Sequence, residues 1–127
     1  NQVVFIPPIS DRKLLFGIVK LTRLFIFPST HEGMSMMLLE AASLGVPIIC
    51  SNIPENIATM QHHVVYFQSG DSINLAEKIQ WSLDHVEEIS ELGQKASIFV
   101  KENFTWGEIA KQYDELYRAC VNFTEIK

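Results

Sequence analysis

The sequence predicts an α/β/α sandwich with a parallel sheet, for three reasons. Short apolar runs rich in β-branched and aromatic residues recur along the chain, and each ends at proline, glycine or polar residues. Segments with helical apolar periodicity separate these runs. Strands that alternate with helices pair in parallel through right-handed crossovers. With 127 residues, 47% of them hydrophobic, the chain is long enough to bury one core.

Strands are predicted at residues 3–6, 24–27, 46–50 and 64–67. The first of these is short and ends at Pro7-Pro8, because proline cannot continue a ladder. Ser10 or Asp11 then caps a helix. Its predicted buried stripe consists of Leu14, Leu15, Ile18 and Val19.

The later segments are predicted to be mainly helical. A short helix surrounds Pro54, and another helix follows a cap at Asp71 or Ser72. A second amphipathic helix includes the periodic positions Ile89, Leu92, Ala96 and Phe99. Thr105 opens a capping box for the final helix. The residues expected to be buried on that helix are Ile109, Tyr113, Leu116 and Cys120.

The loop after residues 24–27 is the candidate functional segment. Pro28-Ser29 ends the strand, and a turn at Gly33 opens a helix that runs to Leu44, where Gly45 is the expected cap. In open parallel sheets, ligands bind at the carboxyl ends of the strands. Backbone N–H groups at residues 33–36 are suited to an anion, because a helix N-terminus carries unpaired donors and partial positive charge.

Two glutamates lie at fixed spacing in this segment. Glu32 and Glu40 are eight positions apart, which is about 12 Å if the segment is helical, so they cannot act on one atom. A nucleotide sugar fits this spacing, with the sugar near Glu32, the diphosphate over the helix N-terminus and the ribose near Glu40. In the alternative interpretation Glu32 caps the helix and Glu40 lies on a solvated face. Spacing alone does not decide between the two.

A longer motif contains these residues: Pro28-Ser29-x-x-Glu32-Gly33, then Leu39-Glu40-Ala41-Ala42-x-x-Gly45-x-Pro47-Ile48-Ile49. It resembles the donor-site motif of the "glycosyl transferases group 1" family, retaining enzymes of the GT-B architecture. The resemblance continues through Pro54-Glu55, Gly70-Asp71 and Phe104-Thr105-Trp106. It implies that residues 1–127 form a single Rossmann-like, donor-binding C-terminal domain, truncated at its N-terminal side and without the N-terminal acceptor domain.

The resemblance also implies roles for individual residues. Glu32 contacts the transferred sugar near the reacting carbon, Glu40 holds the ribose, and the loop at residues 7–10 meets the nucleobase. The remaining donor-binding residues are Ser29, Gly33, Met34, Ser35, Met36, Met37, Ile9 and Ser10. Of these, the N–H groups of Ser35, Met36 and Met37 face the diphosphate. The basic side chains that the family uses there lie upstream of Asn1.

The implied reaction transfers a sugar from a nucleoside diphosphate sugar, with retention, to an unknown carbohydrate or lipid-linked acceptor in cell-surface polysaccharide or lipopolysaccharide synthesis. We expect the isolated chain to be inactive, because the site forms between two domains. Alternatives are a non-catalytic nucleotide-binding module and another GT-B enzyme, an epimerase or a phosphorylase. Both glutamates at the full spacing disfavour a non-catalytic module.

Composition limits the partners. A net charge of −5 argues against nucleic acid. Cys50 and Cys120 lack metal-type spacing and no Asp-x-Asp pair occurs, so we expect no metal or other cofactor. Reduced thiols favour a cytoplasmic protein.

Two further interactions are considered, one with a membrane surface and one with a second copy of the chain. Four basic residues precede Glu32: Arg12, Lys13, Lys20 and Arg23. They suit the solvated face of a helix, a positive local potential for a diphosphate, or peripheral contact with an anionic membrane surface. In the family two central strands precede residue 3, so an open sheet edge is expected, and with it dimerisation or domain swapping of the fragment.

Overall fold

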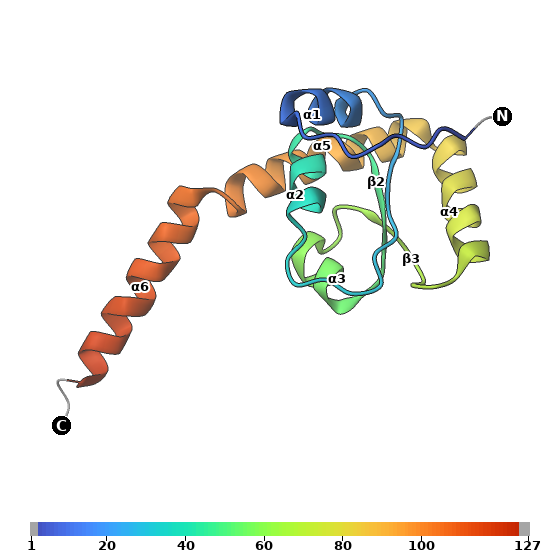
Figure 1. Ribbon diagram of the computed structural model, residues 1–127. Coiled ribbons are helices and arrows are strands. Elements are labelled where there is room, and N and C mark those ends of the chain that lie inside the picture. The colour runs from blue at the N-terminus through green and yellow to red at the C-terminus, as the bar shows by residue number, and fades with distance from the viewer. Residues whose placement is uncertain (1–2, 125–127) are drawn as a thin grey trace.

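The computed structural model describes residues 3–124, with side chains described for residues 3–121. Within that range the chain forms three strands and six helices (Figure 1). In chain order they are α1 Arg12–Lys20, β1 Phe25–Phe27, α2 Met36–Ser43, β2 Ile48–Ser51, α3 Pro54–Met60, β3 Val65–Phe67, α4 Ser72–Asp84, α5 Val86–Asn103 and α6 Trp106–Thr124.

The three strands form one parallel sheet in the order β1-β2-β3, which confirms the predicted α/β fold. Phe27 pairs with Cys50, and Cys50 pairs with Tyr66. Strand β2 is central and every residue in it is buried, as expected for a strand covered on both faces. Leu38 of α2 and Met60 of α3 are fully buried in the core beside it.

The predicted first strand is absent from the described part of the chain. Residues 3–6 are extended but unpaired, and their side chains are exposed, with Phe5 at 93%. An apolar run becomes a strand only where a neighbouring strand forms hydrogen bonds with its N–H and C=O groups. The described sheet offers residues 3–6 no such strand, so the prediction of four strands is corrected to three. Whether an open edge recruits a second copy stays a prediction.

Helix α1 begins as predicted. The carboxylate of Asp11 accepts hydrogen bonds from the N–H groups of Lys13 at 2.9 Å and Leu14 at 3.3 Å. The predicted buried stripe is only partly correct, since Val19 is 4% exposed but Leu14 is 55% exposed. Leu15 and Val19, four positions apart, share the helix face that packs on the core, and Leu14 lies outside that face.

Helices α2 and α5 pack closely, and this contact fixes the position of α2. Gly45 ends α2 with φ of +75°, which confirms the predicted glycine cap. A Cβ added to Gly93 of α5 would lie 2.7 Å from the Gly45 carbonyl oxygen, so only glycine allows this approach. The Ser97 hydroxyl of α5 also donates to the Ser43 carbonyl at 2.9 Å.

The last third of the chain is helical, as predicted. Asp71 caps α4 through the N–H groups of Ile73 and Asn74. The Thr105 hydroxyl accepts from the Glu108 N–H at 3.2 Å, which confirms one half of the capping box at the start of α6.

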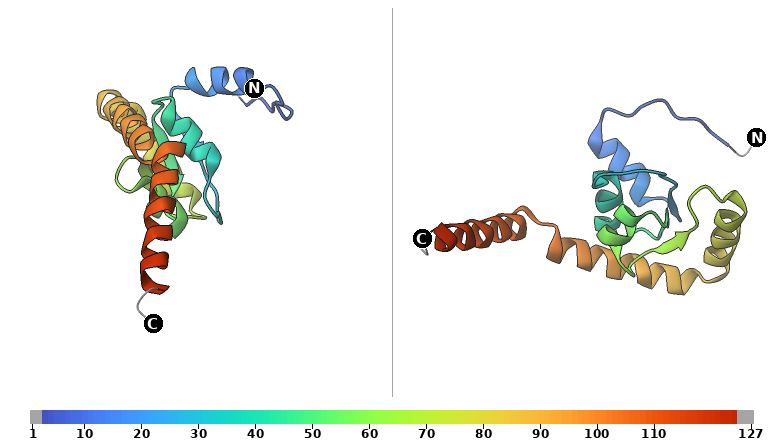
Figure 2. Two further views of the ribbon diagram at one scale, coloured as in Figure 1. Left: turned by 90° about the vertical axis from the view of Figure 1, so that its left-hand side faces the viewer. Right: turned by 90° about the horizontal axis from the view of Figure 1, so that it is seen from below.

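Helix α6 extends away from the rest of the molecule (Figures 1 and 2). The predicted burial of Tyr113, Leu116 and Cys120 is therefore wrong for this chain, because all three are exposed. The helix packs on α5 near its start and then diverges from the core. Its apolar periodicity is present, but over most of its length no described element covers that face.

Candidate functional site

The candidate site lies on the loop at residues 28–35, which joins β1 to α2. Phe27 and Cys50 are in register, so the residues that follow these two strands meet at the carboxyl end of the sheet. Ser51 ends β2 and is fully buried, while Ser29 lies on the loop and is half-buried. This is the edge at which the sequence predicts ligand binding.

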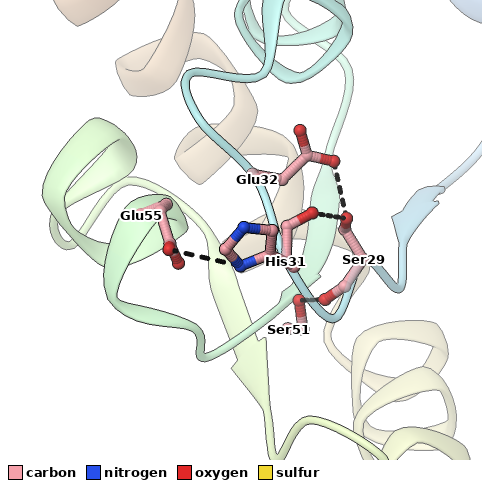
Figure 3. A network of polar contacts seen from close by, with 5 residues as sticks. All are labelled: Ser29, His31, Glu32, Ser51 and Glu55. Atoms are coloured by element: carbon pink, nitrogen blue, oxygen red, sulfur yellow. Dashed lines mark hydrogen bonds and ion pairs between the residues drawn. The ribbon is translucent and has the colours of Figure 1, made fainter.

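Glu32 is held by a neutral side chain of its own loop. The Ser29 hydroxyl donates to Glu32 Oε1 at 2.5 Å, and Figure 3 shows the two side chains turned toward each other. The His31 carbonyl oxygen lies 3.2 Å from the same hydroxyl, but a serine has one proton to donate. The carboxylate is the closer acceptor and carries the charge, so it is the stronger partner.

Two buried residues, Ser51 of β2 and Asn56 of α3, hold this loop from its core side. The Ser51 hydroxyl donates to the Ser29 carbonyl oxygen. The Asn56 side-chain amide of α3 donates to the Ser51 carbonyl oxygen at 3.0 Å and lies 3.1 Å from the Ser51 hydroxyl oxygen. Asn56 is 1% exposed. A continuous set of hydrogen bonds therefore runs from the buried side of α3 to Glu32.

His31 lies at the rim of the loop. Its Nδ1 is 3.9 Å from Glu55 Oε1, and its side chain is 90% exposed. Such a contact between exposed groups contributes little to stability. Figure 3 shows the ring on the side of the loop that faces α3.

The N-terminus of α2 is capped by Ser35, whose hydroxyl accepts from the Leu38 N–H at 3.3 Å. The alternative in which Glu32 caps the helix is therefore wrong, because Ser35 occupies that position. In residues 3–124 no oxygen accepts from the N–H groups of Met36 and Met37. These two groups are available for an anion, together with the positive end of the helix dipole.

The loop beside these donors is open. Met34 is 57% exposed and Met36 59% exposed, and a Cβ added to Gly33 would meet no atom within 4 Å. A ligand can therefore approach the backbone at Gly33 closely. Ser35, by contrast, is buried at 7% exposure by its capping role.

Glu40 lies on α2 and has a cationic partner. The Arg12 guanidinium of α1 contacts Glu40 Oε1, and it also lies over the Phe16 ring at 5.0 Å from the centroid. The Glu40 side chain is 23% exposed, so the face of α2 that carries it is only partly solvated. Sequence reasoning missed this pair, because residues 28 positions apart follow no local spacing rule.

The loop at residues 7–10 precedes α1 directly. Ile9 is half-buried and Ser10 is exposed. Since Arg12 begins α1 and contacts Glu40, the structure brings this loop to the Glu40 end of the candidate site. The residues predicted to bind the sugar, the diphosphate and the nucleoside thus lie on loop 28–35, on α2 and on the loop before α1.

The site has no activated thiol. Burial raises the pKa of the Cys50 thiol to about 12, so it stays protonated at neutral pH. Burial also raises the pKa of Tyr66, and the nearby Cys50 adds to this shift. In the described part of the chain, no three His, Cys, Asp or Glu side chains lie close enough together to hold a metal ion. No helix there is long and apolar enough to span a membrane.

An apolar groove of about 600 Å³ lies between this loop and α6. One wall comes from Met34, Met36 and Leu39. The residues from the other side are Phe104, Trp106, Ile109, Gln112, Tyr113 and Leu116. Met34 of the loop and Met36 of α2 are both exposed and line this groove.

Comparisons with known proteins point to one family. A sequence model described as "Glycosyl transferases group 1" matches residues 1–99. The O-antigen biosynthesis glycosyltransferase WclY of Escherichia coli is 28% identical over 93 residues, which cover 73% of this chain and 26% of WclY. These 93 residues exceed the loop and α2, so the likeness is not confined to the candidate site.

Two solved structures superpose well. Sucrose-phosphate synthase from Thermosynechococcus elongatus matches with a TM-score of 0.80 and 26% identity, over 94% of this chain and 30% of that one. HepE of Anabaena, solved in complex with UDP, matches with a TM-score of 0.73 and 18% identity, over 80% of this chain and 29% of HepE. The second likeness shows a shared fold. This chain spans between 26% and 30% of the length of the three proteins.

Proposed function

Because the chain belongs to the glycosyl transferases group 1 family, we propose that it forms the donor-binding part of an enzyme that transfers a sugar, with retention, from a nucleoside diphosphate sugar. One observation carries the proposal. Two separately held carboxylates, Glu32 and Glu40, lie on either side of the unpaired N–H groups that begin α2. A ligand with a neutral group at each end and an anion between them matches that order.

The donor would lie along the loop and α2. The sugar lies beside Glu32 and the open backbone at Gly33, and the diphosphate accepts from the N–H groups of Met36 and Met37. A ribose hydroxyl donates to Glu40. The base lies toward Ile9 and Ser10, which precede α1. The roles of Ser29 and Ser35 are structural in part, since Ser29 holds Glu32 and Ser35 caps the helix, while the exposed Met34 is proposed to contact the donor directly.

The proposed mechanism depends on the charges that develop on the sugar and on the diphosphate as the bond between them breaks. As the bond between the sugar and the diphosphate breaks, the sugar becomes positively charged at its reacting carbon and the diphosphate becomes more negative. The α2 N-terminus stabilises the leaving group, because its donors are already oriented. Glu32 faces the developing positive charge. Its partner Ser29 is neutral, so the full negative charge of the carboxylate remains available there.

The acceptor and the remainder of the site belong, in this proposal, to an additional domain of a longer protein. WclY is named for O-antigen biosynthesis, which supports a carbohydrate or lipid-linked acceptor in cell-surface polysaccharide assembly. We place the reaction in the cytoplasm. We propose also that no metal is required, since backbone donors of α2 and basic residues outside this chain would neutralise the diphosphate.

The decisive experiment is a panel of nucleoside diphosphate sugars tested for binding and hydrolysis by the full-length enzyme. We expect one donor class to bind and to release its nucleoside diphosphate slowly without an acceptor. Binding of nucleotides with no release of sugar from any donor or acceptor preparation would instead support a non-catalytic module. Efficient transfer by the 127-residue chain alone would contradict the two-domain proposal.

A further inference from the structure

The hydrogen bonds beneath Glu32 form a support that begins in the core. Ser51 is fully buried at the end of β2, and Asn56 is 1% exposed on α3. Neither residue reaches the loop surface where a donor would lie. Ser51 nevertheless contacts the loop directly, because its hydroxyl donates to the carbonyl oxygen of Ser29.

The Ser51 hydroxyl both donates and accepts a hydrogen bond in this set. A serine hydroxyl has one proton and two lone pairs. Ser51 gives its proton to the Ser29 carbonyl and accepts from the Asn56 amide at 3.1 Å. The same amide donates to the Ser51 carbonyl at 3.0 Å, which fixes the direction of both groups. Hydrogen bonds between buried groups restrict their motion, and the loss of one member leaves its buried partners unpaired.

Ser29 transmits this rigidity to Glu32. The backbone of Ser29 is fixed by Ser51, and its hydroxyl holds Glu32 Oε1 at 2.5 Å. Glu32 lies on a loop, where backbone freedom is greater than on a strand or helix. Figure 3 shows Ser51 on the opposite side of Ser29 from the Glu32 carboxylate.

We propose that Ser51 is a positioning residue for Glu32, acting through Ser29 and supported by Asn56. The inference rests on the proposed function, in which Glu32 faces the reacting carbon. Small displacements of a group in that position cost far more in rate than in binding, because the interaction develops in the transition state. Ser51 would therefore influence kcat without touching the donor.

The chain offers a matched control for a purely structural role. Ser97 is 5% exposed, and its hydroxyl donates at 2.9 Å to the Ser43 carbonyl, which joins α5 to the end of α2. It is thus a second buried serine that holds a backbone carbonyl, with no contact to the loop at residues 28–35. Ser51→Ala and Ser97→Ala each remove a buried hydroxyl that donates to a backbone carbonyl, at two different places.

The test compares these two variants in the full-length enzyme, with thermal unfolding, donor KM and kcat measured for each. We expect both to lower the Tm, Ser51→Ala by at least as much as Ser97→Ala because the Asn56 amide also loses an acceptor. Ser51→Ala should lower kcat about tenfold with donor KM within about twofold, whereas Ser97→Ala should leave kcat unchanged and act, if at all, on donor KM, because its contact holds the helix that carries Glu40. Should Ser51→Ala fail to fold, Ser51→Cys serves in its place, because its slightly larger thiol fills the site but donates only weakly.

A double-mutant cycle tests whether Ser51 acts through Glu32. In the Glu32→Gln background we expect Ser51→Ala to have no further effect on kcat. A full tenfold loss in that background, or a normal kcat for Ser51→Ala alone, would overturn this inference and leave the proposed function intact. A wild-type kcat for Glu32→Gln would overturn the proposed role of Glu32 and this inference with it.

Discussion

The two glutamates of the site are held in opposite ways. Glu32 lies on a loop and accepts from a neutral hydroxyl, which is supported by buried Ser51. Glu40 lies on a helix and pairs with the exposed guanidinium of Arg12, whose side chain is 71% exposed. One support is uncharged and continuous with the core, whereas the other is charged and at the surface.

This difference indicates different demands on the two carboxylates. A neutral partner fixes the direction of Glu32 without offsetting its charge, which suits a group that faces developing positive charge. A ribose hydroxyl carries no charge, so a carboxylate that binds it loses little when a cation takes its other oxygen. The rigid helix α2 already positions Glu40, and the loop at residues 28–35 needs the additional hydrogen bonds.

The sharpest test of the comparison is Glu32→Gln in the full-length enzyme. The amide keeps the shape but removes the negative charge, and the loss is felt mainly in the transition state. We expect kcat to fall by about 100-fold with little change in donor KM, as measured by steady-state kinetics. A rise in KM with kcat preserved would mean that Glu32 serves binding only.

Glu40→Gln should behave differently in the same assay. It removes an ionised acceptor of a ribose hydrogen bond, worth roughly 1.5 to 3 kcal/mol in ground and transition states alike. Donor KM should rise by about tenfold or more while kcat changes little. Loss of kcat in this variant would contradict the assignment of Glu40 to the ribose.

Arg12→Gln should have a smaller effect. Ion pairs with an exposed partner contribute about 0.2–1 kcal/mol, so we expect a donor KM up to about fivefold higher with kcat unchanged. Lys13→Gln is the control, since it removes the same charge from α1 at an exposed position next in the chain. Equal effects from both variants would indicate long-range attraction of the diphosphate rather than the contact with Glu40.

Removal of divalent ions should have the smallest effect of all. Each carboxylate already has a protein partner, and the proposed charge stabilisation comes from N–H groups of α2. We expect full activity of the dialysed full-length enzyme in excess chelator. Activity lost on chelation and restored by Mn²⁺ or Mg²⁺ would contradict the metal-free proposal.

Local rules predicted most of the fold correctly. Asp11, Gly45 and Asp71 end or begin helices as expected, because capping depends on residues a few positions away. The errors concern residues 3–6 and the exposed face of α6. The apolar run at residues 3–6 and the apolar periodicity of α6 are both present in the sequence. Neither segment is covered by a neighbouring element in the described structure, and local rules cannot predict which elements pack together.

For the candidate site, the sequence predicted the motif residues but not the side chains that hold them. The motif with Glu32 and Glu40 lies in one continuous stretch, so its order along the site could be predicted. The partners of these residues could not. Ser51 reaches Ser29 across 22 positions, and Arg12 reaches Glu40 across 28. Such pairs depend on strand register and helix packing, which appear only once the chain is folded.

The close approach of α5 to the end of α2 has a consequence for mutational scans. Gly93 touches no candidate site residue, yet any side chain there would press on the carbonyl of Gly45 and shift the helix that carries Glu40. A scan scored by activity alone would rank position 93 with the donor-binding positions. Scoring protein abundance in parallel would separate them, because Gly93 variants would be depleted from cells while Glu40 variants would accumulate normally.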